Sequence, residues 1–144
     1  GQPVTFVRHR LRNTGSTAIE GTLTLAVRPM QMNPPWQNGG LSPIREVAVA
    51  GNAVRVNGRT LLQSVTAVDA AGAAPFGNEG DTEITSAIAS GQLPAAQQTS
   101  DAAGLAAAAL SYRVSLAPGA SDAVVVVFPL GTATAAHSFT AGWV

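Results

Sequence analysis

The feature that most constrains this chain is a period-two alternation of apolar and polar side chains. The first alternating run carries Val7, His9 and Leu11 on one face and Arg8, Arg10 and Arg12 on the other. Because successive side chains of a β-strand point to opposite faces, residues 4–12 are predicted to form a half-buried strand. Residues 19–28 alternate in the same way after a turn cluster at 13–16. We therefore predict a hairpin in which Arg12 pairs with Glu20 and His9 faces Leu23.

Two tighter hairpins are predicted in the middle of the chain. Gly51-Asn52 suits a two-residue turn because glycine accepts a positive φ. Pairing about this turn sets Val49 opposite Val54 and Val47 opposite Val56. Asn57-Gly58 is a second signal of this kind and leads into a strand over residues 60–68. The segment is therefore predicted to be a meander of short strands.

The second half of the chain contains two further strands and one helix. Residues 70–80 and 95–104 are small or polar and are predicted as loops, whereas 81–90 is predicted as a helix. Residues 105–116 begin with alanines, which favour helix, but they continue into a clean alternation that predicts one long strand. The valine run in 122–130 predicts a strand buried on both faces. Together these patterns predict an all-β fold, an antiparallel β-sandwich with one short helix near 81–90.

The composition limits the classes of partner. The 144 residues suit one domain, predicted over 1–136, with 137–144 leading to a following domain. Charged residues are 11%, against about 25% in average proteins, so we expect part of the surface to be covered by another unit. A formal net charge of zero gives no electrostatic footprint for nucleic acid or an anionic membrane. The absence of cysteine excludes disulfides and thiol chemistry.

No catalytic motif is visible, and neither a cofactor nor a metal is predicted. His9 is interpreted as a core residue on an inward strand face and His137 as a solvated or contact residue. An acidic cluster at Glu79, Asp81 and Glu83 has two readings. It could bind calcium through carboxylate oxygens, or it could complement the dipole at a helix N-terminus. The second reading is favoured because the spacing of an EF-hand is absent.

The arginines form a candidate docking patch. Arg8, Arg10, Arg12 and Arg28 are predicted to lie on the outer face of the sheet. In one interpretation they dock onto an acidic partner or an anionic ligand. In the other they form a solvated face in which Arg12 pairs weakly with Glu20. The low overall charge of the chain makes three alternate arginines more unusual here than elsewhere.

The stretch RPMQMNPPWQNGG, residues 28–40, places a tryptophan in a proline-stiffened loop. Trp36 could fold back on its own sandwich, or it could stack on a sugar ring or fill a partner's pocket. The two prolines lower the entropy cost of projecting the loop outward. We therefore name Asn33, Trp36 and Gln37 as candidate ligand or domain contacts, with both alternatives open.

Three stretches carry a family resemblance: LTLAVRPMQMNPPWQ, ASGQLP after the short helix, and ALSYRVSLAPGASDAVVVVFPLG. They resemble the accessory, N-terminal β-sandwich of bacterial glycoside hydrolase-like proteins with a six-hairpin α/α toroid, of the glucoamylase or cellobiose-phosphorylase type. The resemblance implies a noncatalytic sandwich that packs on the helical catalytic domain of its parent protein. It also implies that the 28–40 loop reaches the rim of that domain and contacts either its substrate or the toroid itself. By the same resemblance the catalytic acids belong to the toroid, and a secreted or periplasmic location is expected.

Two other functions compete with this one. An independent carbohydrate-binding module needs exposed aromatic side chains on a sheet face or a shared rim. A structural immunoglobulin-like spacer or adhesion domain needs polar outer faces on both sheets. The chain by itself is not expected to be an enzyme, although its parent protein could be a glycoside hydrolase or phosphorylase.

Overall fold

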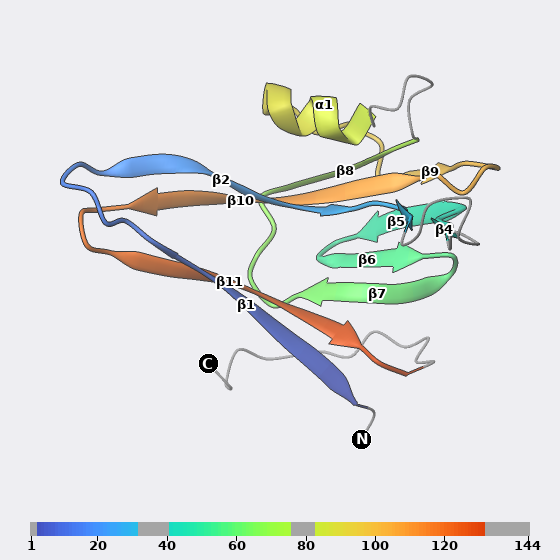
Figure 1. The fold of residues 1–144 in the computed structure, drawn as a ribbon, viewed down its shortest axis with the longest axis horizontal. Coiled ribbons are helices and arrows are strands. Elements are labelled where there is room, and N and C mark those ends of the chain that lie inside the picture. Colours follow the sequence, from blue (N-terminus) through green and yellow to red (C-terminus); the bar gives the residue numbers. More distant parts are fainter. Residues whose placement is uncertain (1–2, 32–40, 76–82, 132–144) are drawn as a thin grey trace.

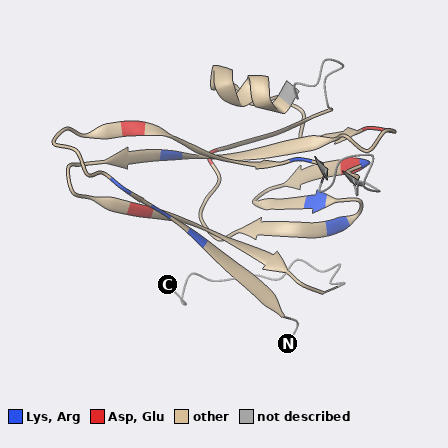
Figure 2. Cartoon of the chain, viewed as in Figure 1, with Lys and Arg blue, Asp and Glu red and all other residues tan. Residues whose placement is uncertain are grey.

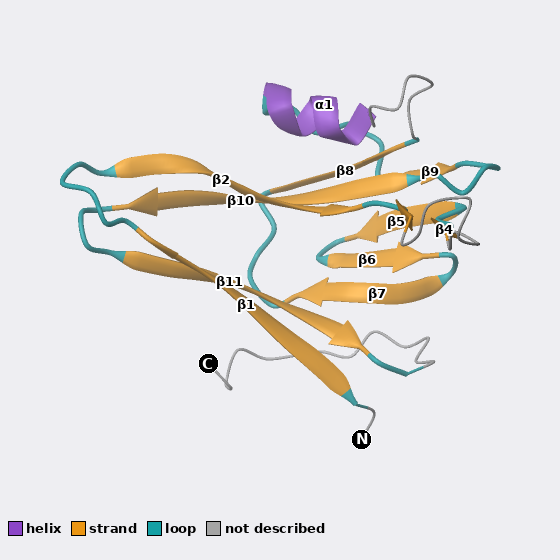
Figure 3. Ribbon diagram, in the orientation of Figure 1, coloured by secondary structure: helices purple, strands orange, loops and turns teal. Residues whose placement is uncertain are grey.

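The computed structural model describes residues 3–31, 41–75 and 83–131. Two layers of antiparallel strands face each other, and one helix lies on the outside of the smaller layer (Figure 3). The fold is therefore the all-β sandwich that the alternating pattern predicts.

The larger sheet has six strands, in the spatial order β1 (Val4–Arg12), β11 (Ser121–Pro129), β7 (Arg59–Ser64), β6 (Ala53–Val56), β5 (Glu46–Ala50) and β9 (Gln98–Ser100). The smaller sheet has the order β2 (Ile19–Val27), β10 (Ala107–Leu116) and β8 (Ala70–Ala74). A short pair joins β3 (Met30–Gln31) to β4 (Leu41–Ser42), and the helix is α1 (Glu83–Ser90). Figure 1 shows these elements with the same labels.

Two arches connect the sheets at one end of the sandwich, on the left in Figure 1. The first joins β1 to β2 and the second joins β10 to β11, so each crosses from one layer to the other. Asn13 links them: its Nδ2 donates to the carbonyl oxygens of Thr17 at 2.8 Å and Leu116 at 2.9 Å. Its backbone N–H also donates to the carbonyl of Ala120 at 2.9 Å.

The core fills the space between the inner faces of the two sheets. Its fully enclosed side chains come from both layers: Val47, Val54 and Val126 from the larger sheet, and Leu110 and Tyr112 from the smaller. Burying a valine or leucine side chain contributes roughly 1.5–3 kcal/mol. The hydroxyl of Tyr112 donates to Ser64 Oγ at 2.9 Å, so one hydrogen bond crosses the core between the layers.

The predicted hairpin between residues 4–12 and 19–28 is wrong, although both strands exist. β1 pairs with β11, which sets Arg12 opposite Ser121 and His9 opposite Val124. β2 pairs with β10, which sets Leu23 opposite Tyr112. Alternation determines which face of a strand is buried but not which strand lies beside it. The connection at 13–18 therefore forms an arch between layers instead of a turn within one sheet.

Both local hairpins are confirmed, the first of them also in its predicted register. Val49 lies opposite Val54 and Val47 opposite Val56 across the Gly51-Asn52 turn. The Asn57-Gly58 turn joins β6 to β7, with positive φ values of 48° and 79° at its two residues. The strand predicted over 60–68 ends at Ser64.

The long strand predicted over 105–116 is confirmed as β10, which begins at Ala107 and lies between β2 and β8. β11 is buried on both faces in its middle, since none of Val124, Val125, Val126 and Val127 is more than 8% exposed. Two expected loops contain strands: β8 lies within 70–80 and β9 within 95–104. Their residues are small and weakly patterned, so their strand pairing comes from neighbours that are distant in sequence.

The helix packs on the outer face of the smaller sheet. Ile84 is fully buried against Ala107 and Ala109, whose small side chains allow the helix to approach β10 closely. The helix ends as predicted at Gly91, which has a φ of 73° and donates its N–H to Ile88 O at 3.1 Å. The predicted cap, Asp81, lies outside the described residues.

Candidate functional site

The outer face of the larger sheet carries three arginines in a row. Arg8, Arg10 and Arg12 alternate along β1, and all three are exposed. Strand geometry separates neighbouring members by about 6.6 Å along β1. We call these three residues the arginine row; Figure 2 marks the basic positions along β1 in blue.

The arginine row makes no ion pair or side-chain hydrogen bond with any residue that the structure describes. Within those described ranges, the one ion pair joins Arg113 to Asp69 in the other sheet. The row holds three of the eight arginines of a chain whose net charge is zero. It therefore forms a local positive region on an otherwise weakly charged surface, a place where an anionic group gains favourable electrostatic energy.

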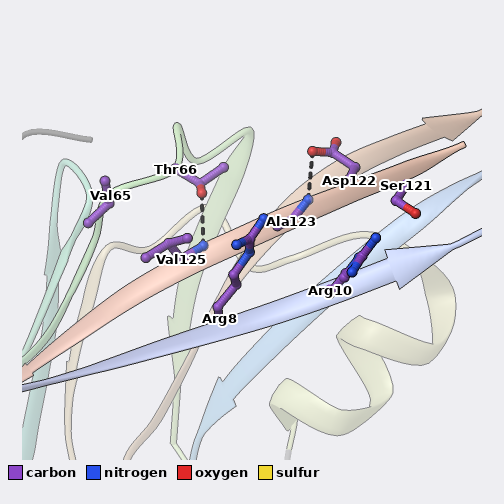
Figure 4. Close-up of a pocket in the computed structure, with 8 residues that line it drawn as sticks. All are labelled: Arg8, Arg10, Val65, Thr66, Ser121, Asp122, Ala123 and Val125. Carbon is purple, nitrogen blue, oxygen red and sulfur yellow. Dashed lines mark hydrogen bonds between the residues drawn. The ribbon is translucent and has the colours of Figure 1, made fainter. Parts of the chain in front are cut away.

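A groove of about 630 Å³ lies beside the arginine row. Its floor includes Ala123 and Val125, the strand partners of Arg10 and Arg8. Val65 and Thr66 form one wall of the groove. The hydroxyl oxygen of Thr66 accepts the Val125 N–H at 2.9 Å. Figure 4 shows both guanidinium side chains along this groove, with the Asp122 carboxylate at its far end. That carboxylate accepts the Ala123 N–H at 2.7 Å.

Apolar side chains continue the same face beyond Arg8. Phe6, which alternates with the row on β1, is 51% exposed and lies opposite Val127. Leu61 on β7 is 38% exposed and shares the outer face with Gln63, the partner of Val127. The face thus joins a basic half to an apolar half, a combination that suits contact with another protein surface.

A second concave surface lies on the smaller sheet where the C-terminal end of α1 leaves it uncovered. We call it the helix cleft; its volume is about 590 Å³. The hydroxyls of Thr24 and Ser111, which lie opposite each other on β2 and β10, are 3.0 Å apart. Ile88 and Leu93 form its apolar wall. Local sequence patterns do not reveal this cleft, because it requires the pairing of β2 with β10.

An ion pair organises the rim of the helix cleft. Asp69 accepts the Arg113 backbone N–H at 2.7 Å through Oδ2 and the Arg113 Nε–H at 3.1 Å through Oδ1. These bonds, the backbone one first, hold the pKa of Asp69 below its ordinary value. The carboxylate is therefore ionised and oriented at neutral pH. Its contribution to stability is lost on acidification through the lowered pKa.

The predicted docking patch is only partly brought together. Arg8, Arg10 and Arg12 share one face, but Arg28 follows β2 in the other sheet, because the predicted β1–β2 hairpin does not form. His9 lies half-buried on the inner face of β1, opposite Val124.

Several other predicted residues fall outside the described part of the chain. Asn33, Trp36 and Gln37 belong to residues 32–40, and His137 follows residue 131. Glu79 and Asp81 fall within 76–82, while Glu83 is the first residue of α1. The loop contacts and the two readings of the acidic cluster therefore stay predictions.

Among the described residues, no group of three or more histidine or carboxylate side chains is arranged to hold a metal ion. No helix in these same ranges combines the length and apolar character needed to cross a membrane. No protein-family model, curated protein or solved structure matches the chain.

Proposed function

We propose that this chain is a noncatalytic β-sandwich domain that packs on a helical carbohydrate-active domain of the same parent protein. The observation that carries the docking role is the outer face of the larger sheet. There, three arginines without partners in the described chain adjoin exposed Phe6 and Leu61. The nature of the partner rests on the sequence resemblance, and by that resemblance the 28–40 loop reaches the partner's rim.

The mixed face favours docking over the two competing functions. A spacer would present polar outer faces on both sheets, whereas the outer face of this sheet exposes Phe6 and Leu61. A sugar-binding module would stack carbohydrate on exposed aromatic rings. Of the three aromatic side chains in the described ranges, Tyr112 is buried and Phe128 packs on the core, so only Phe6 is exposed in this part of the chain.

The test is to produce this chain and the helical domain of the parent protein separately. Titration calorimetry then measures the affinity between them. The double variant Arg8→Ser/Arg10→Ser should bind about tenfold more weakly, because each exposed charge pair contributes up to about 1 kcal/mol. Raising the salt concentration should weaken the wild type and leave the variant less affected.

Arg45→Ser is the matched control, since Arg45 is exposed and adjoins β5, four strands away from β1. It removes the same charge and should retain wild-type affinity. A parent protein without a helical domain would contradict the proposal, as would equal losses in the control and the row variants. Binding of glucans by the isolated chain, independent of any partner, would favour the sugar-binding module instead.

A further inference from the structure

Within the described residues, β1 forms one edge of the larger sheet and pairs with β11 alone over its nine residues. In an antiparallel pair, alternate residues direct their N–H and C=O groups toward the partner strand. The Leu130 N–H donates to Pro3 O at 2.9 Å, and the Asn13 N–H donates to Ala120 O at 2.9 Å. Residues 3 and 13 are both odd-numbered, and the register between them has no shift. The backbone N–H and C=O groups of the odd-numbered residues of β1 therefore point toward β11.

The even-numbered residues therefore direct their backbone N–H and C=O groups to the open edge. The geometry of β11 agrees with this assignment. The backbone N–H and C=O of Val125, the strand partner of Arg8, point away from β1. The N–H donates to Thr66 Oγ1 and the C=O accepts from the Val65 N–H, both at 2.9 Å. The arginine row thus supplies both the outward side chains and the free backbone groups of this edge.

The inner side of the same edge is apolar. Val7 and Leu11 are half-buried on the inner face of β1, with His9 between them. β2 forms the edge of the smaller sheet, and its Leu23 and Leu25 are half-buried toward the same core. In a strand added beside β1, every second side chain would therefore lie next to these apolar residues of β1 and β2. The side chains between them would lie beside the guanidinium groups.

Charge decides which strand fits. A second copy of β1 would bring arginines opposite arginines, and like charges placed directly opposite on paired strands are destabilising. This is also how natural proteins protect an open edge from self-association. A strand with carboxylates at every second position would instead match the spacing of the arginine row residue by residue.

We infer that β1 accepts an added β-strand from the docking partner, an extended segment in which Asp or Glu alternates with apolar residues. Main-chain hydrogen bonds to Arg8, Arg10 and Arg12 provide affinity, and the paired charges provide register. This inference rests on the proposed docking function and specifies the chemistry of the partner's contacting segment.

The test uses two synthetic heptapeptides of identical composition with the 144-residue chain. One alternates glutamate with valine from end to end, and the other has four glutamates followed by three valines. Affinities are measured by calorimetry, and amide hydrogen exchange is followed residue by residue by NMR. The alternating peptide should bind about tenfold more tightly, since only it can place a carboxylate opposite each arginine. In excess, it should slow exchange at the Arg8 and Arg10 amides by at least about tenfold.

Two variants separate the backbone from the charge. Arg10→Gln removes the charge and keeps the free N–H, whereas Arg10→Pro removes both. Proline is tolerated on edge strands where the N–H faces solvent, and the Arg10 N–H makes no bond to β11 in this register. Arg10→Pro should therefore bind the alternating peptide more weakly than Arg10→Gln does. If Arg10→Pro does not fold, the exchange pattern of the wild type still decides the question.

Equal affinity for the two peptides, with unchanged exchange at Arg8 and Arg10, would overturn strand addition. Docking through the outer face would then be tested separately, by the titration of the helical domain with the Arg8→Ser/Arg10→Ser variant. Conversely, protection of the two amides by the alternating peptide would support strand addition even if the helical domain failed to bind.

Discussion

At the scale of single residues, Asn13 shows how a turn-forming side chain acquires a long-range role. It is only 3% exposed, although it follows an exposed arginine at the end of an edge strand. Its Nδ2 bonds two carbonyls, one of them 103 residues away at Leu116, and its Oδ1 accepts the Gly15 N–H at 2.9 Å. Local sequence suggests only a turn at this position, because asparagine favours turns by bonding its own backbone neighbours.

We predict that Asn13→Ala lowers the free energy of unfolding by about 2–4 kcal/mol, because it removes one buried hydrogen bond, to Leu116 O, and two part-buried ones, to Thr17 O and Gly15 N. Urea denaturation followed by circular dichroism measures the change. Thr14→Ala is the control, since Thr14 is exposed and its side chain makes no hydrogen bond with any residue that the structure describes. A loss at Asn13 no larger than that of the control would show that the arches hold together without this side chain.

At the scale of elements, β8 shows why small residues can form a strand that sequence patterns miss. Gly72 lies opposite Ala109, and a Cβ at its position would be 2.2 Å from the carbonyl oxygen of Pro94. The segment after α1 continues along β8, where the Ala73 N–H donates to Ala96 O at 2.7 Å. Glycine is needed here because two backbones approach closely.

We predict that Gly72→Ala destabilises the fold by about 1–3 kcal/mol, because the added methyl group forces backbone apart. Gly21→Ala on β2 is the matched control: a Cβ there meets nothing within 4 Å. That control should be neutral or slightly stabilising, because alanine reduces the freedom of the unfolded chain. Thermal and urea denaturation of the two variants give the comparison, and equal stabilities would contradict the packing described here.

At the scale of the whole molecule, the two sheets share one core, and the Tyr112 hydroxyl joins them through Ser64. The Ser64 hydroxyl in turn donates to Thr66 O at 2.6 Å, beside the groove of the arginine row. Burial raises the pKa of Tyr112, and the hydrogen bond with Ser64 partly opposes this effect. Ionisation of this phenol is therefore coupled to loss of the packing between the layers.

The alkaline stability of the chain should therefore depend on Tyr112. A pKa raised in the folded state gives stability that is complete below about pH 10 and lost as the pH rises through the folded-state value. The chain has one tyrosine and no cysteine, and all its basic residues apart from the two histidines are arginines. Between about pH 9 and pH 11, its side-chain titration is thus that of Tyr112.

We predict that the wild type loses stability as the pH rises above about 10 and that Tyr112→Phe shows a flatter profile. Urea denaturation at each pH gives the profile. Phenolate absorbance gives the pKa of Tyr112 directly, in the folded chain and in urea. A phenol that titrates at the same pH in both states would contradict the coupling.

The sequence by itself determined where most strands lie and which of their faces are buried. Alternation along residues 4–12 and the valine run of β11 act through the pleat of a single strand, so neither needs information from elsewhere. The Gly51-Asn52 and Asn57-Gly58 hairpins were predictable for the same reason, because two-residue turns fix the register of the strands they join. The arginine row follows from alternation alone.

Tertiary structure decided which strands became neighbours. β1 pairs with β11, more than a hundred residues away in the sequence, and β2 pairs with β10. Alternation does not select these partners, because an amphipathic strand can pair with any strand that extends its apolar face. That choice separated Arg28 from the arginine row and assembled the helix cleft from Thr24 and Ser111. It also left β1 at an edge of the larger sheet, where the backbone groups and the guanidinium groups of Arg8, Arg10 and Arg12 have no partner among the described residues.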